Sequence, residues 1–513
     1  MLLSLLLLLL LPLSSPLSSL SHTPPSFLGS TSYTHDSSLS LFSPPSSLHV
    51  LPLERFSRKK HDGGCPFHLL PLLPHHTNPV NYVENHHFIE SRLTHPAFHL
   101  FLSSHMCMAP SNAALTTFSV ESGSHPADPL DPPPPLPPPT PPPQLSHHLS
   151  HAYSTYPFAP VPPSPTTHTH TSGEPSTDLI SVLDGMGSSL HDMLAPNALT
   201  TDLPLFPPDS LVYILLDSLL ITSSALPPLP NAPPAIPLST LTITHLNPSL
   251  TYRESESFYT LSHTSTRNAT NPLTRTPIPL TKRFATTPTP PHIPNFGFEF
   301  VNSLGGVWSR LSQSLFNDWN AAGKVMGLGS YGVVTGGGGG TVIGGSLWDP
   351  RAPMWVELGR EGLSGEPVHC KLGPNAMDFT MEVGEDGRVK EVGKGAGSKS
   401  VRKWTPGREI EEGVLVGITR ACELQKDTNA IVIDAIRYLI RATNARGVIC
   451  AGGVHQNSVL NGAIYEEGGG EVFVGPWPGD EGQAIGGCMY AAIEGGIEVR
   501  HTNERMHMCK HSV

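Results

Sequence analysis

Hydrophobic and polar positions in the second half of this 513-residue chain follow regular periods. Apolar residues recur at helical spacing over 303–316 and again over 408–445, which predicts two amphipathic helices. Residues 449–487 have the pattern of a strand, a Gly-Gly turn, a helix, a second strand, and a Gly-Asp turn into a final helix. This pattern predicts an α/β fold for the second half.

The first half is patterned less regularly. Short apolar runs separated by turn residues predict two or three strands over 28–62, and helical spacing begins at 147–158. Residues 178–187 predict a buried strand that ends in an Asp-Gly turn. A Pro-rich insert at 124–143 contains a polyproline spacer that cannot form a core. Residues 196–295 are rich in Pro, Thr and Ser, and we expect them to be mostly loop or disordered, with folding resuming at residue 296.

Composition limits the classes of partner and site. The formal net charge is −12 at pH 7 and no run of Lys and Arg follows a surface, which argues against nucleic acid as a partner. The seven Cys include no CxxC pair, which argues against a zinc ribbon or a disulfide framework. The chain contains 56 Pro but only 14% charged residues, so we expect long segments outside any packed core.

Residues 1–27 form a Leu-rich leader. It is too short to span a bilayer easily, and it lacks a basic region because Arg55 is the first Lys or Arg. We therefore expect a cytoplasmic protein without membrane association. A secretory signal and a misassigned gene start remain alternatives.

Candidate metal ligands stand at the start of the helical segment 147–158. His147 and His151 are four residues apart, so both lie on one helix face at a spacing usual for two metal ligands. In a chain with 27 His, however, a chance HxxxH is not rare. Taken alone, Asp184 is also compatible with an ordinary strand-ending turn and Asp480 with a helix cap. Gly452 and Gly453 predict a tight strand–helix turn, where backbone N–H groups bind phosphate well.

Eight segments, in order, resemble the O-carbamoyltransferases of nodulation-factor and antibiotic biosynthesis. They are HDSS at 35–38, ERFSRKKH at 54–61, HHLSHA at 147–152, LDG at 183–185, SLGGVWS at 303–309, GKVMGLGSYG at 323–332, AGGVHQN at 451–457 and GDEGQAIGG at 479–487. The resemblance implies the duplicated actin-like ATPase and sugar-kinase fold. Its halves would lie at 28–190 and 296–500, separated by a low-complexity insert at 191–295 and followed by a tail at 501–513.

The resemblance also implies a reaction. Family members transfer a carbamoyl group from carbamoyl-adenylate, made from carbamoyl phosphate and ATP, to a hydroxyl of a sugar or secondary metabolite. An iron-type metal ion would be held by His147, His151, Asp184 and Asp480. The nucleotide would lie at Asp184, Gly185, Gly452, Gly453, Asn457 and Asn461. His35 is our candidate for deprotonating the acceptor hydroxyl, and Lys60 belongs to a basic cluster that can hold a phosphate.

Two departures from the family pattern affect these expectations. Ser188 stands where the family has an acidic residue after its LDGVG segment. Residues after 487 do not resemble the YrdC-like domain that forms the adenylate in family members, so we expect a separate adenylate-forming protein as partner. Two alternatives remain: a protein like the tRNA threonylcarbamoyl transferases, which share the fold and metal site, or a truncated, inactive copy acting at most as a Pro-rich interaction protein.

Overall fold

The computed structural model describes residues 26–32, 36–43, 47–61, 69, 72, 80–86, 115–116, 145–155, 176–194, 201–215, 218–229, 233–263, 276–287, 303–330, 332–334, 370–372, 381–383, 389–391 and 412–494. The polyproline spacer, the C-terminal tail, His35 and all but the last two residues of the leader lie outside these ranges. Within the described ranges, no helix is both long and apolar enough to cross a membrane.

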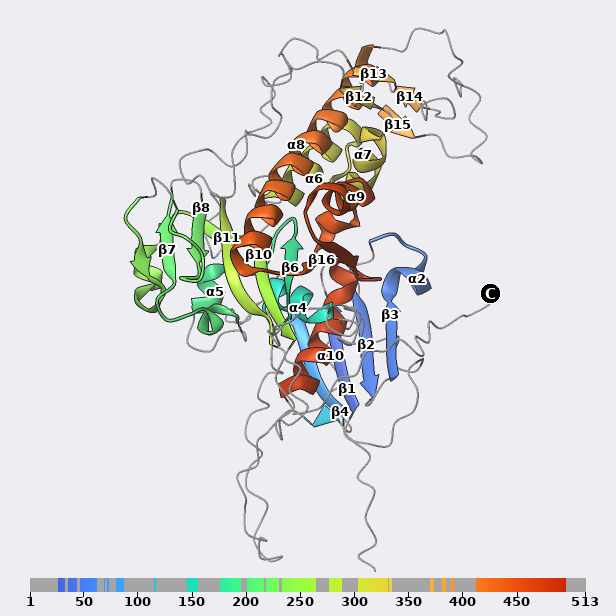
Figure 1. Ribbon diagram of the computed structural model, residues 1–513. Helices are drawn as coiled ribbons and strands as arrows, with labels where there is room; N and C mark the ends of the chain where they lie inside the picture. Colours follow the sequence, from blue (N-terminus) through green and yellow to red (C-terminus); the bar gives the residue numbers. More distant parts are fainter. Residues whose placement is uncertain are drawn as a thin grey trace, which may run out of the picture.

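A five-stranded sheet is formed by the first part of the chain, with the order β3-β2-β1-β4-β5 (Figure 1). The first three strands form an antiparallel meander, whereas β4 lies parallel to β1 and β5 parallel to β4. The strands predicted within 28–62 are therefore present. The five are β1 (Ser26–Ser32), β2 (Ser38–Ser43), β3 (Ser47–Pro52), β4 (Val80–His86) and β5 (Leu115–Thr116).

An eight-stranded mixed sheet has the order β17-β16-β6-β10-β11-β8-β7-β9. Strands β6, β10 and β11 form an antiparallel meander, β16 lies parallel to β6, and β17 lies parallel to β16. The run β11-β10-β6-β16-β17 thus has the same order and strand directions as the five-stranded sheet. Its strands are β6 (Ser176–Leu183), β10 (Thr251–His263), β11 (Ile278–Thr287), β16 (Gly447–Ala451) and β17 (Glu471–Val474).

The expectation that 196–295 is mostly loop is wrong. This range supplies β10 and β11 at the centre of the large sheet and β7 (Leu211–Ile214), β8 (Ser218–Thr222) and β9 (Ile236–Pro237) at its edge. Strands β10 and β11 are buried although they contain Ser, Thr and charged residues, because the charges pair across the strands, as Glu256 does with Arg283. The predicted division into halves needs the same correction, because β6, β10 and β11 pair within the sheet that contains β16.

Alternating side chains of β6 enter two different cores, as the period of a strand requires. Leu179 and Leu183 pack in the core that contains residues of α6, α7, α8 and α9. Ile180 and Val182 pack on the other face with residues of β1, α4 and α10. The helices predicted over 303–316 and 408–445 are present as α6 and α8. The helices are α4 (His147–Ser154), α6 (Leu304–Phe316), α7 (Ala322–Gly329), α8 (Glu412–Thr443), α9 (Ser458–Glu467) and α10 (Gln483–Glu494).

Shorter elements complete the described part. Two small antiparallel strand pairs, β12 with β13 and β14 with β15, lie near α8 (Figure 1). Helix α10 contacts β1, β2 and α4, so α4 and its histidines lie in the interior beside both sheets. The remaining elements are α2 (Leu53–Ser57), α5 (Leu190–Leu194), β12 (Gly332–Val334), β13 (Cys370–Leu372), β14 (Met381–Val383) and β15 (Val389–Glu391).

Candidate metal centre

Helix α4 is buried along its whole length, and it carries two imidazoles that face the same point. The Nε2 atoms of His147 and His151 lie 3.2 Å apart, as the four-residue spacing on one helix face allows. Both side chains are 0% exposed. Buried imidazoles need polar partners, because leaving them unpaired in the interior costs free energy.

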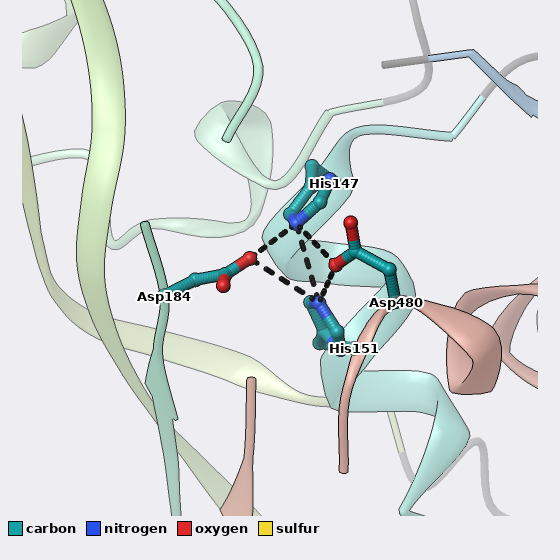
Figure 2. A group of neighbouring side chains, drawn as sticks. All are labelled: His147, His151, Asp184 and Asp480. Atoms are coloured by element: carbon teal, nitrogen blue, oxygen red, sulfur yellow. Dashed lines mark hydrogen bonds and ion pairs between the residues drawn. The ribbon is translucent and has the colours of Figure 1, made fainter. Parts of the chain in front are cut away.

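Two carboxylates from distant segments supply these partners (Figure 2). Asp184 directly follows β6, and Asp480 opens a 3₁₀ turn, Asp480–Gly482, before α10. Asp184 Oδ2 lies 2.5 Å from His147 Nε2 and 3.5 Å from His151 Nε2. Asp480 Oδ1 lies 3.4 Å and 3.3 Å from the same two atoms. One ligand atom from each of the four buried residues therefore lies within 4.8 Å of all the others.

The Gly-Gly turn orients Asp184. Its Oδ1 accepts hydrogen bonds from the backbone N–H of Gly185 at 2.8 Å and of Gly453 at 3.2 Å, which leaves Oδ2 directed at the imidazoles. Gly452 has φ +90°, and a Cβ there would lie 2.3 Å from the carbonyl oxygen of Leu183. Only glycine accommodates both conditions, so this residue lets the chain bring the Gly453 N–H to Asp184.

Gln483 orients Asp480, although no sequence motif marked it as a site residue. Its Nε2 donates to Asp480 Oδ1 at 2.8 Å and lies 3.0 Å and 3.2 Å from the Nε2 atoms of His147 and His151. The side chain is 0% exposed. Its spacing of three residues after Asp480, at the start of a helix, is the signal that indicates contact between the two.

The electrostatics of the cluster favour positive charge. Burial lowers the pKa of His151, but hydrogen bonds and charge from Asp184 and Asp480 outweigh it and raise the pKa to about 9. Burial and the charge of Asp480 raise the pKa of Asp184, yet His147 and His151 hold it well below its usual range. Two carboxylates and two imidazoles thus converge on a point where a cation is stabilised.

The spacing of the ligand atoms fits a transition-metal ion. Metal–nitrogen and metal–oxygen bonds are about 2.1 Å long. When the ligand–metal–ligand angle lies between about 90° and the tetrahedral angle, neighbouring ligand atoms are therefore roughly 3.0 to 3.4 Å apart. The contacts of His151 with His147 at 3.2 Å and with Asp480 at 3.3 Å lie in this range. The 2.5 Å contact between His147 and Asp184 is shorter, so Asp184 would shift slightly to share an ion.

The other predicted site residues are placed differently. Asn457 caps α9, with its Oδ1 accepting from Leu460 N at 3.1 Å, and donates to Gln425 at 2.8 Å. Asn461 donates to the carbonyl oxygen of His455 at 2.7 Å. Their side chains are therefore engaged within the protein. Lys60 is exposed on the turn after α2, and His35 lies outside the described residues.

A second group of polar residues connects the HDSS and ERFSRKKH segments. His61 Nδ1 lies 3.0 Å from Asp36 Oδ1, and His61 N donates to Glu54 Oε2 at 3.3 Å. Ser38 Oγ donates to the carbonyl oxygen of Glu481 at 2.7 Å, which ties this region to the turn that carries Asp480. Local sequence patterns do not predict the pairing of Asp36 and His61, because the contact spans two segments.

His455 should make the protein sensitive to acid. It is buried between Asn461 and Ser181, and burial lowers its pKa to about 4. Because the unfolded chain binds this proton near its ordinary pKa of about 6.5, the stabilisation is present above that pH and is lost as the pH falls toward 4. When the pH falls from about 7.5 to about 5, the free energy of unfolding of wild type should decrease by about 2 kcal/mol more than that of His455→Gln. Urea unfolding at both pH values measures this difference, and equal losses would contradict it.

Comparison with known proteins finds a family-model match for one segment of the chain. Residues 409–489 match the family model described as the carbamoyltransferase N-terminus. The matched segment contains the Gly452–Gly453 turn and Asp480, whereas the other three residues of the cluster precede it. No curated protein matches the chain. Residues 409–489 therefore resemble part of a carbamoyltransferase N-terminal domain, the family that the ordered sequence motifs predicted.

Proposed function

We propose that the chain transfers a carbamoyl group from carbamoyl-adenylate to a hydroxyl of a sugar or secondary metabolite. At the active site, His147, His151, Asp184 and Asp480 would hold a divalent transition-metal ion. The observation that carries this proposal is the convergence of four buried ligand atoms within 4.8 Å of one another in a chain whose residues 409–489 match the carbamoyltransferase N-terminus. Two imidazoles and two carboxylates suit an iron-type ion.

The chain's own residues would prepare this site for the reaction. A bound ion supplies Lewis-acid polarisation of the carbamoyl carbonyl. Asp184 is held by the N–H groups of Gly185 and Gly453, and Asp480 by Gln483, so two ligands are oriented before substrate arrives. Burial of the ligands keeps water from competing electrostatically. Lys60 would pair with a phosphate oxygen, and His35 would accept the proton of the acceptor hydroxyl.

The sheets support the duplicated actin-like fold for this proposal. The run β11-β10-β6-β16-β17 repeats the order and strand directions of β3-β2-β1-β4-β5. We therefore place the two halves at residues 26–155 and 176–494, each built on one such sheet. Both α4 and the turns carrying Asp184 and Asp480 meet where the halves join.

A nucleotide at the Gly-Gly turn would stabilise the folded chain. A non-hydrolysable carbamoyl-adenylate analogue at 100 times its Kd should add about 2.7 kcal/mol, seen as a higher Tm. Gly453→Val should remove the increase, because its side chain would stand where the phosphates approach the turn, with its Cβ 3.1 Å from Asp184 Oδ1. Gly462→Val is the control, since its Cβ meets nothing within 4 Å. Both variants should be measured with and without EDTA, to separate metal loss. An unchanged shift in Gly453→Val would place the nucleotide elsewhere.

The identity of the carbamoyl donor is tested by comparing two donors, pre-formed carbamoyl-adenylate and carbamoyl phosphate with ATP. The bond from Gly453 N to Asp184 Oδ1 places the glycine turn beside the ligand cluster, which supports binding of an adenylate with its carbonyl at the ion. We propose that a separate protein makes the adenylate. With an added sugar as hydroxyl acceptor, purified chain should release AMP from pre-formed carbamoyl-adenylate faster than buffer does, as the carbamoyl group passes to the sugar hydroxyl, and His147→Ala/His151→Ala should not. Carbamoyl phosphate with ATP should give no pyrophosphate above background. Pyrophosphate release by the chain alone would contradict the proposed partner.

A further inference from the structure

Helix α4 begins without a cap from its own N-terminal residue. The first N–H groups of any helix lack intrahelical acceptors and need partners. Ser146 precedes the helix but makes no side-chain capping bond. Instead, His147 N donates to Ser188 Oγ at 2.9 Å, and His148 N donates to Glu254 Oε2 at 3.3 Å. The helix that carries two candidate ligands is therefore capped by residues distant in sequence.

Glu254 contacts both segments that carry ligands. It lies on β10 and is 0% exposed. Besides His148 N, its Oε2 accepts the N–H of Ser188 at 2.9 Å, four residues after Asp184. Its backbone also pairs with this turn, because Gly187 N donates to Glu254 O at 2.7 Å and Glu254 N to Ser188 O at 3.0 Å. The carboxylate that the sequence lacks at Ser188 is thus supplied from β10.

Buried charges fix the position of this carboxylate. The Lys282 ammonium on β11 pairs with Glu254 Oε1 and, at 2.7 Å, with Asp202 Oδ2. Tyr259 donates to Asp202 Oδ2 at 2.7 Å. Burial lowers the pKa of Lys282, but Asp202 and Glu254 raise it above its ordinary value. The ammonium therefore stays charged, and breaking this network would leave a buried charge unpaired.

We propose that Glu254 is a positioning residue that fixes α4 relative to Asp184 and thereby sets the geometry of the metal centre. This inference rests on the metal-dependent function proposed above. One carboxylate oxygen of Glu254 joins the first turn of α4 to the turn after Asp184 through two backbone N–H groups. Metal–ligand distances tolerate deviations of only about 0.2 Å. Movement between these two segments would therefore weaken binding without removing a ligand.

Glu256 provides a matched control on the same strand. It is also buried, and it pairs with Arg283 on β11 at 2.9 Å. Its Oε1 accepts the N–H of Leu304, the first residue of α6, at 2.9 Å. Both glutamates thus combine a buried ion pair with capping of a helix start, but α6 carries no residue of the four-member cluster. A purely structural role would make the two substitutions equivalent for metal binding.

Titration of the full chain with Co²⁺ tests the proposal through affinity and the visible absorption of the bound ion. Glu254→Gln should raise the Kd for Co²⁺ about 10- to 100-fold, the usual effect of losing an outer-shell partner. It should also speed hydrogen exchange of the first-turn amides of α4. Glu256→Gln should lower the Tm and raise the Kd for Co²⁺ less than Glu254→Gln does, because the start of α6 contacts the turn at Asp184 (Gly305 N to Asp184 O, 3.2 Å) but Glu256 does not cap α4. A Kd for Glu254→Gln within twofold of wild type, or an equal rise in Glu256→Gln, would overturn the proposal.

Ser188→Ala covers the case in which Glu254→Gln does not fold. It removes only the Oγ acceptor of His147 N, and we expect a smaller but measurable rise in the Kd for Co²⁺. An unchanged Kd in this variant would show that contacts between α4 and the turn after Asp184 do not set metal affinity, which would overturn the positioning role. If wild type binds no Co²⁺, the proposed metal function fails. The positioning role is then tested by amide hydrogen exchange of α4 in Glu254→Gln or Ser188→Ala. Exchange rates equal to those of wild type would contradict that role.

Discussion

Replacing His147 and His151 together by Ala should reduce the metal content of the purified chain from about one ion per chain to background. Both imidazoles direct Nε2 at the same point, so the double variant removes two of the four candidate ligands. Two carboxylates alone leave a site open to water, which binds a transition-metal ion far more weakly. Elemental analysis of wild type and variant measures the change.

His148 supplies the control for this experiment. It lies on the same helix and is equally buried, but its Nδ1 lies 2.7 Å from Ser257 Oγ and its side chain is not part of the cluster. His148→Ala should keep about one ion per chain while losing stability. Equal metal content in wild type and in His147→Ala/His151→Ala would contradict the assignment of these ligands.

Gly486→Ala should destabilise the protein by about 3 kcal/mol or more, the upper range for overpacking a core. A Cβ at this position on α10 would lie 2.0 Å from the carbonyl oxygen of Ser150 on α4, and backbone cannot move aside as a flexible side chain can. The substitution would push α10 away from α4. Asp480 lies in the turn before α10, and Gln483 is the first residue of α10. Moving this helix would therefore also move Asp480 and Gln483 away from His147 and His151.

Gly462→Ala in α9 is the matched substitution, since its Cβ would meet nothing within 4 Å. There we expect a gain of about 0.5 to 1 kcal/mol, because Ala favours the helix over Gly. Urea unfolding gives both values. A loss of less than about 1 kcal/mol in Gly486→Ala would show that the two helices can separate freely, against the packing described here.

Local patterns in the sequence predicted the elements that depend on local spacing. Helices α6 and α8 follow from their apolar periods, and the strand, turn and helix around Gly452 follow from the order of apolar residues and glycines. The pair His147 and His151 is local too, because one helix turn separates them. These features require no knowledge of what the helix packs against.

Features that depend on tertiary contacts could not be predicted in this way. Strands β10 and β11 were missed because their Ser, Thr and Pro content is typical of loops, and only pairing with β6 and β8 makes them strands. Ser188 stands where the family has an acidic residue. The compensating Glu254 lies 66 residues away, beyond any local pattern. The contact between Asp36 and His61 likewise joins two segments.

Diffraction from crystals soaked in Co²⁺, recorded at the cobalt absorption edge, tests the central claim most directly. The account predicts one anomalous peak within bonding distance of Nε2 of His147 and His151 and of carboxylate oxygens of Asp184 and Asp480. A map without a peak at these four residues would contradict it. So would a peak only at another group, such as Asp36, Glu54 and His61, whose ligand atoms also lie within 4.8 Å of one another.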